Sequence, residues 1–320
     1  MKIQKIFLLL ILMLFLVLFA SCAQSTNNET ISTPTLTRIS PTQTLAPTLT
    51  LTPDSTYTPA AVPTLSVDHA RARLLELLFN NGDCRLPCLW GITPGKSNYQ
   101  EAQDILTPIG SLSKFIFLSS SPGDISPIYT EGDLMLQTRV AYLYRDNGIV
   151  SGIAFYARQE KKGIEPDGSS SVTPIFDSAT FGKRIEYYSL AHVLSEQGMP
   201  DSVMIATSDP SSLPVGAGAF YIALFYPDQG IWVKYTTSIH VTGNSVRGCP
   251  ENAHIEMKLY PSGNPDSYSA LIKETDWWVQ KDWYKPIEEV TSMSVEQFYQ
   301  TFRQPTDKCI ETPAKLWRIP

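Results

Sequence analysis

The sequence predicts an α+β fold in which helices pack on one face of an antiparallel sheet. Helical patterns that begin at capping residues alternate with apolar runs of strand length. The turn signals Asp146-Asn-Gly148 and Asp228-Gln-Gly230 separate pairs of those runs, as β-hairpins require. The pattern around Gly148 also recurs around Gly230, which predicts two tandem units of helix, strand and hairpin, followed by a C-terminal extension tied by a disulfide.

The start of the chain indicates export. Met1–Lys5 carries two lysines, and Ile6–Phe19 is an apolar run of fourteen residues, too short to cross a bilayer comfortably. Residues 1–21 are therefore predicted to be a signal peptide. An ordinary secretory signal and an uncleaved anchor helix are the alternatives to a lipoprotein signal.

Phe19-Ala-Ser-Cys22 resembles the lipobox of bacterial lipoproteins, with Phe19 in place of the usual leucine. The resemblance implies that Cys22 carries a diacylglyceryl group and becomes the first mature residue. More than one acyl chain on one residue anchors a protein stably. We therefore expect the chain on the extracytoplasmic face of the cell membrane, with the membrane as its partner through the lipid.

Residues 22–65 are expected to form a disordered stalk behind the lipid. Residues 23–65 are rich in threonine, carry hardly any charge and show no apolar periodicity, so they cannot bury a core. Recurring prolines favour extended chain, which would place the folded part up to roughly 100 Å from the membrane. Threonine-rich stalks of this kind also accept O-linked sugars. The prolines are Pro34, Pro41, Pro47, Pro53, Pro59 and Pro63.

The net charge argues against nucleic acid as a partner. The chain has a formal charge of −6, and removing residues 1–21, with two lysines and no acidic residue, leaves 23 basic against 31 acidic side chains. Such a surface repels phosphate backbones. Residues 66–320 remain, enough for one large domain or two small ones.

An even number of cysteines remains once Cys22 is lipidated, which predicts disulfides in an exported chain. Of the three pairings we expect Cys84–Cys88, which can close locally, and Cys249–Cys309. The longer loop would contribute about 4 kcal/mol in the chain-entropy model, and the shorter about 2 kcal/mol. A zinc site held by all four thiolates or a catalytic dithiol is the alternative, although neither usual spacing is present.

Two helices are predicted early in the folded part. Ser66 can cap a helix over residues 66–80 that buries a leucine face, with Gly82 ending it. Ser97-Asn-Tyr-Gln100 has the pattern of a capping box and predicts a second helix through Leu106.

Between those helices lies Cys84-Arg-Leu-Pro-Cys-Leu-Trp-Gly-Ile-Thr-Pro-Gly95. This string, with a later Tyr-Pro-x-x-Gly hairpin and a Cys-x-x-Thr-Pro near the end, resembles a group of uncharacterised bacterial lipoproteins with the same stalk. The resemblance covers nearly the whole mature chain and implies no activity.

Setting Gly110 on Gly198 aligns two segments of about 97–157 and 189–236, leaving 249–320 as the extension. Their helix, glycine stop and antiparallel ribbon resemble the SmpA/OmlA-type lipoprotein domain and, in tandem, the β-lactamase inhibitor protein fold. Those families bind other proteins, so the resemblance implies a protein partner here.

Three further segments complete the prediction. Gln159–Ser178 is charged and serine-rich, which favours a loop or a binding lid. Residues 255–260 have the pattern of a strand, and Ser294-Val-Glu-Gln297 opens a last helix with a capping box, burying Phe298 and Phe302.

The densest aromatic cluster is Asp276–Tyr284, with Trp277, Trp278, Trp283 and Tyr284. Exposed, these rings would stack on sugars or anchor a partner, since they offer large contact area at low entropic cost. Buried, they would clamp this segment onto the core.

No motif indicates catalysis, a cofactor or a metal. The histidines are scattered, with no His-Glu-x-x-His or Gly-x-Ser-x-Gly pattern; they are His69, His192, His240 and His254. We expect a non-catalytic protein-binding scaffold at the cell surface. Binding of carbohydrate or cell wall through residues 277–284 is the second hypothesis, and a hydrolase with two unrecognised carboxylates the third.

Overall fold

The computed structural model describes most of the chain from Thr64 onward, and all described residues belong to one compact unit, Pro59–Pro320. The described residues are 64–112, 124–125, 128–131, 134–144, 148–164, 170–176, 178–208, 218–264, 269 and 284–317. The signal peptide, Cys22 and nearly all of the expected stalk lie outside them.

The secondary structure is as follows. The α-helices are α2 (Val67–Asn80), α3 (Tyr99–Leu106), α4 (Ala179–Arg184), α5 (Leu190–Gln197), α7 (Ile287–Val290) and α8 (Val295–Phe302). The 3-10 helices are η1 (Asn81–Asp83), η2 (Thr107–Leu112), η3 (Glu186–Tyr188) and η5 (Ala314–Trp317). The strands are β1 (Asp124–Ile125), β2 (Ile128–Glu131), β3 (Leu134–Tyr144), β4 (Val150–Ile164), β5 (Ser170–Pro174), β6 (Ser202–Thr207), β7 (Ala219–Tyr226), β8 (Ile231–Ser238), β9 (His240–Thr242), β10 (Ser245–Gly248), β11 (His254–Leu259), β12 (Lys285–Pro286) and β13 (Ile310–Pro313).

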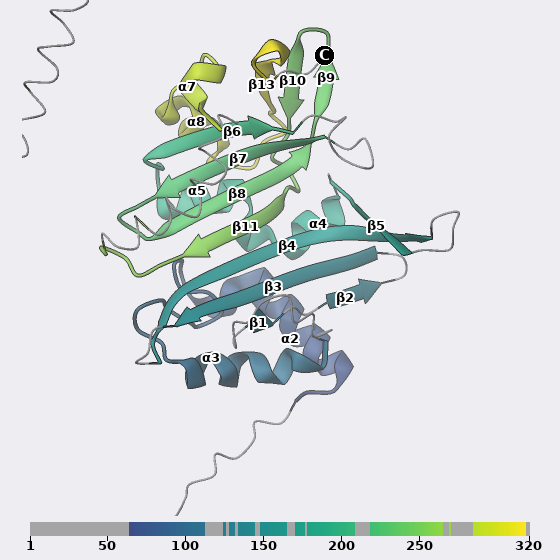
Figure 1. Ribbon diagram of the computed structural model, residues 1–320, viewed down its shortest axis with the longest axis vertical. Helices are drawn as coiled ribbons and strands as arrows, with labels where there is room; N and C mark the ends of the chain where they lie inside the picture. The colour runs from purple at the N-terminus through teal and green to yellow at the C-terminus, as the bar shows by residue number, and fades with distance from the viewer. Residues whose placement is uncertain are drawn as a thin grey trace, which may run out of the picture. The chain divides into compact units, whose positions relative to one another are not determined.

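The predicted α+β class is confirmed. Ten strands form one antiparallel sheet in the order β1-β3-β4-β11-β8-β7-β6-β12, with β2 paired to β3 and β5 to β4. Helices α2, α4 and α5 lie behind this sheet in Figure 1. Alternate residues of the central strands face the helices, because successive side chains of a strand point to opposite sides. They form one core with the helices and include Phe155, Val233 and Met257.

Strand β11 belongs to the predicted C-terminal extension and lies at the centre of the sheet. It pairs with β8 along its whole length and with β4 from Ile255 to Leu259. The hairpins β3–β4 and β7–β8 are therefore joined through a strand that comes after both in the sequence (Figure 1). Residues 254–259 of the predicted extension are therefore part of the central sheet.

The tandem repeat is not confirmed. Hairpins β3–β4 and β7–β8 lie on opposite sides of β11, with β3 and β7 outermost and parallel to each other. Both hairpins bury residues against the same helical face. A rotation that superposes the hairpins would turn one buried face away from the helices, so the sheet order gives the predicted repeat no support.

What the two segments share is local turn chemistry. Gly148 and Gly230 both have positive φ, 74° and 69°, as the hairpin turns require. Gly198 ends α5 with φ 85°, whereas Gly110 lies inside η2 and has no positive φ. The expected match of Gly110 to Gly198 is therefore wrong.

Two predicted capping boxes have different outcomes. The box at α8 is confirmed: Ser294 Oγ accepts from Gln297 N at 3.2 Å, and Gln297 Oε1 accepts from Ser294 N at 2.8 Å. The box at α3 lies one residue later than expected and joins Asn98 to Glu101. The Ser97 hydroxyl instead accepts from a loop amide at 3.0 Å. At α2, Ser66 occupies the N-cap position without capping a backbone N–H.

The insert expected to be a loop is mostly strand. Residues 160–164 of β4 pair with β5, residues 170–174, and form a ribbon. Its Ile164 side chain is 82% exposed and Val172 is 48% exposed. Among the described residues, no helix is both long and apolar enough to cross a lipid bilayer.

Candidate functional site

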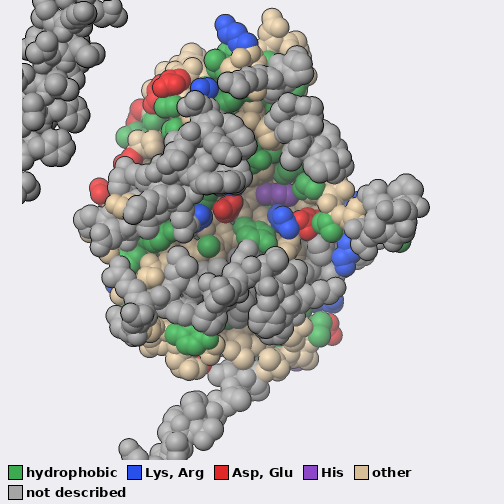
Figure 2. Space-filling view, viewed as in Figure 1, with side chains coloured by type: hydrophobic (Ala, Val, Ile, Leu, Met, Phe, Trp, Pro, Cys, Tyr) green, Lys and Arg blue, Asp and Glu red, His purple; other side chains and the backbone are tan. Residues whose placement is uncertain are grey.

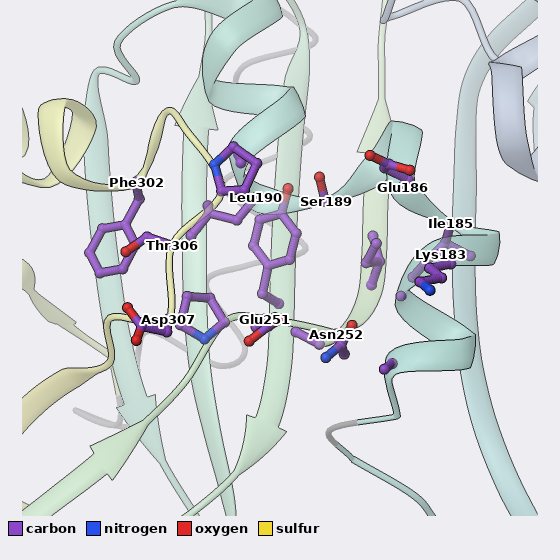
Figure 3. Close-up of a pocket in the computed structure, with 18 of the residues that line it drawn as sticks. Lys183, Ile185, Glu186, Ser189, Leu190, Glu251, Asn252, Phe302, Thr306 and Asp307 are labelled. Carbon is purple, nitrogen blue, oxygen red and sulfur yellow. The ribbon is translucent and has the colours of Figure 1, made fainter.

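A pocket of about 530 Å³ opens on the helical side of the sheet. Its floor is apolar and comes from three elements, with Tyr235 on β8, Ile255 on β11 and Phe302 at the end of α8. Leu190, the first residue of α5, adds to it, and all four side chains are buried. Figure 3 shows the residues that line the pocket.

One wall of the pocket is built by the Cys249–Cys309 disulfide, which confirms the predicted pairing. The Cα atoms of the two cysteines lie 4.2 Å apart. Pro250–Ala253 follows Cys249 directly, and residues 304–307 end two residues before Cys309; both segments line the pocket. The bridge therefore holds together two wall segments that are far apart in the sequence.

The opposite wall comes from α4, η3 and the start of α5. Gly182 of α4 lies against Asn252 so closely that a Cβ at Gly182 would be 1.8 Å from Asn252 Oδ1. Any larger residue at position 182 would require the Asn252 side chain to move, so glycine allows α4 to lie directly against the wall behind Cys249. Ser189 caps α5, because its hydroxyl accepts from His192 N at 3.3 Å.

A buried network positions the start of α5. The Tyr188 hydroxyl accepts from Trp90 Nε1 at 2.9 Å and donates to Asn81 Oδ1 at 3.0 Å. Asn81 Nδ2 donates to the carbonyl oxygens of Cys84 at 2.6 Å and Cys88 at 2.9 Å. These contacts tie the loop of the predicted Cys84–Cys88 disulfide, also confirmed, to the residue before Ser189.

The same network reaches the pocket floor. Tyr235 donates its hydroxyl proton to the Tyr188 carbonyl oxygen at 3.2 Å. Burial raises the pKa of both tyrosines well above the ordinary value, so both hydroxyls stay protonated and keep donating. The floor is thereby fixed by hydrogen bonds as well as by packing.

Beside this network lies a second polar group that does not line the pocket. The Tyr187 hydroxyl is 2.8 Å from the Cys84 carbonyl oxygen and 3.0 Å from Glu196 Oε2, and the Arg85 guanidinium donates to the Glu196 carbonyl oxygen. Burial, assisted by the Glu196 carboxylate, raises the pKa of Tyr187 to about 12. His192 Nε2 lies 4.0 Å from Glu196 Oε2. The ring of this histidine lies 4.5 Å from that of Tyr187, as expected for a structural side chain.

The pocket rim carries charge of both signs with an acidic excess. Glu186, Glu251 and Asp307 line it together with Lys183. Figure 3 shows Glu251 and Asp307 on one side of the pocket and Glu186 with Lys183 on the other. Among the described residues, no three His, Cys, Asp or Glu side chains come together as metal ligands would.

Of the aromatic residues predicted as a contact site, the structure describes Tyr284, which does not line this pocket. Tyr284 packs on the other face of the sheet against Trp232, with its ring 6.4 Å from that of Tyr221. Trp277, Trp278 and Trp283 lie outside the described residues. The structure therefore supports the packing role for Tyr284.

The face that bears Trp232 is rich in cation–π contacts. The ammonium groups of Lys234 and Lys258 lie 5.7 Å and 5.6 Å from the ring of Trp232, which is 3% exposed. Figure 2 views the molecule from this side and shows basic, acidic and hydrophobic side chains close together. These contacts stabilise the sheet.

Sequence reasoning found the two cysteines behind the pocket and missed its carboxylates. A signal was present, since Glu251 and Asp307 are each two residues from a predicted disulfide partner. Residues flanking a bridge must lie close together. The apolar floor could not be found in this way, because its residues come from three elements that only the sheet order brings together.

Comparisons with protein-family models, with curated proteins and with solved structures found no match. The function must therefore follow from the chemistry of the site.

We expect the Cys249–Cys309 bridge to rigidify the pocket wall. In the double variant Cys249→Ser/Cys309→Ser, hydrogen exchange at residues 250–253 and 304–307 should rise, and unfolding free energy should fall by about 4 kcal/mol, as for a long closed loop. The Cys84→Ser/Cys88→Ser variant is the matched control and should lose about 2 kcal/mol. Unchanged exchange in both wall segments of the first variant would contradict the bracing role.

Proposed function

We propose that this chain is an extracytoplasmic, lipid-anchored binding protein that holds its ligand in the pocket between α4, α5 and the Cys249–Cys309 wall. The observation that carries the proposal is the pocket itself. Its volume of about 530 Å³ falls in the range typical of sites for small ligands. Its apolar floor, fixed by the Tyr188–Tyr235 hydrogen bond, offers a preformed surface.

The arrangement favours binding over chemistry. A preorganised apolar floor with polar groups at its edge gives affinity and orientation. The described lining holds no histidine or cysteine that would serve as base or nucleophile. A hydrolase would have to use the rim carboxylates, and no side chain of another described residue orients Glu251 or Asp307 by a hydrogen bond or an ion pair.

The location rests on the start of the sequence. The apolar run ending at Phe19 and the small residues before Cys22 favour a lipid anchor, and Pro-rich residues 23–65 favour a stalk. Such a tether would let the pocket sample space well away from the bilayer. Two disulfides are consistent with an oxidising compartment.

A protein partner is the second candidate function, and one observation favours it. The β4–β5 ribbon carries two exposed apolar side chains, Ile164 and Val172, beside Lys161 and Lys162. Exposed apolar residues rimmed by charge are typical of protein contacts. Carbohydrate binding through residues 277–284 has no comparable support, since Tyr284 is packed against the sheet.

Replacing Cys22 should abolish the anchor. In cells fed an alkyne-bearing fatty acid, the unsubstituted chain should be labelled and should sediment with membranes, whereas Cys22→Ala should be unlabelled and leave the membrane fraction. Ala23→Ser, next to the lipidation site, is the control and should keep the label. Labelling of the Cys22→Ala chain would refute the anchor.

Filling the pocket should weaken ligand binding. The neutral dye N-phenyl-1-naphthylamine should bind the full chain in detergent solution with saturable fluorescence. Ala191→Trp, at a lining position on α5, should weaken binding at least about tenfold, the effect of removing most of the apolar contact. Ser195→Trp, exposed on the same helix and not lining the pocket, should bind like the unsubstituted chain. Equal binding by the two variants would reject the pocket as the site.

A further inference from the structure

Two rim carboxylates are brought together by the disulfide. Glu251 lies two residues after Cys249 and Asp307 two residues before Cys309, and the two Cα atoms of the bridge are 4.2 Å apart. Both side chains line the pocket on the same side (Figure 3). The bridge thus places two negative charges over one edge of an apolar floor.

Both carboxylates are exposed at the rim, and neither has a partner among the described residues, whereas several other acidic side chains of the fold are paired. Glu160 is 2.6 Å from Arg158, Glu256 pairs with Lys234, and Glu101 accepts from a helix amide. By contrast, Glu251 and Asp307 make no ion pair or side-chain hydrogen bond with any described residue. A cation that lies near both carboxylates would be attracted by both charges.

The rest of the pocket fits an apolar body attached to that cation. Phe302 and Tyr235 contribute aromatic rings to the floor, and aromatic faces attract cations as well as apolar groups. Lys183 is the lining residue of opposite charge, and Figure 3 places it across the pocket beside Glu186. The rim therefore has two more negative than positive groups, with the excess at the Glu251 and Asp307 edge.

We propose that the pocket binds an organic cation, with its ammonium group between Glu251 and Asp307 and its apolar body on the floor formed by Tyr235, Ile255 and Phe302. This inference rests on the proposed binding function and names its ligand class. An amphiphilic amine in solution and a lysine side chain of a protein share this chemistry. Anionic ligands of the same shape are repelled at the entrance.

The test compares three probes of one shape and different charge, 4-phenylbutylamine, 4-phenylbutanol and 4-phenylbutanoate, as competitors of the bound neutral dye on the full chain. At low salt and pH 7 the amine should displace the dye at roughly one tenth of the alcohol concentration, the factor expected from two ion pairs at the edge of solvent. The acid should be weaker than the alcohol. The advantage of the amine should shrink in 0.5 M NaCl, because salt screens exposed charges.

Glu251→Gln/Asp307→Asn should remove most of the amine's advantage while leaving displacement by the alcohol unchanged. Glu288→Gln/Glu289→Gln, in the first turn of α7 and outside the pocket lining, is the matched control and should keep the advantage. Because the dye and the alcohol are neutral, unchanged binding of both shows that the variant is folded. A blocked Gly-Lys-Gly peptide forms a further arm; displacement by it as strong as by the amine would assign the cation to a protein lysine.

The outcomes separate the two proposals. Equal displacement by amine and alcohol on the unsubstituted chain would overturn the cation and leave the binding function standing. An amine advantage that survives Glu251→Gln/Asp307→Asn would also overturn it. Failure of the dye and all probes to bind the unsubstituted chain would overturn the binding function as well.

Discussion

The pairing of β11 on both of its edges is the interaction on which the rest of the structure depends. Its backbone joins β4 on one side and β8 on the other, so the sheet is continuous only because of this strand. Met257 at its middle is fully buried between the two hairpins and the helices. Because β11 follows both hairpins in the sequence, the two hairpins can join into one sheet only after this strand is in place.

The pocket follows from that placement. Ile255 of β11 lies in the floor, and Pro250–Ala253 leads into the strand from the Cys249 bridge, so the position of β11 also sets one wall. The opposite wall is set by Tyr188, whose hydroxyl and carbonyl connect the Cys84–Cys88 loop to Tyr235. Both disulfides thus act on the same cavity from different sides. A site held in this way is rigid before a ligand arrives, which lowers the entropic cost of binding.

Local chemistry was predictable from the sequence, and long-range pairing was not. The Ser294 capping box, the glycine turns and the cysteine pairs depend on residues whose spacing or number is visible in the chain. The position of β11 depends on its pairing and packing with strands up to about a hundred residues earlier in the sequence. No local sequence pattern predicts such pairing. The apparent duplication arose because helix stops and hairpin turns recur wherever helices precede hairpins. The sequence predicted the Cys249–Cys309 disulfide of the candidate site but not its apolar floor.

The claim that β11 unites the fold is tested most directly by hydrogen exchange in increasing urea, followed separately in β3–β4 and in β7–β8. Met257→Ala should cost about 2–5 kcal/mol, as for other large buried side chains. Both hairpins should lose protection at one urea concentration, and the variant should lower that concentration equally for both. Two separate transitions, or a shift confined to one hairpin, would show that the halves fold independently and would contradict the account.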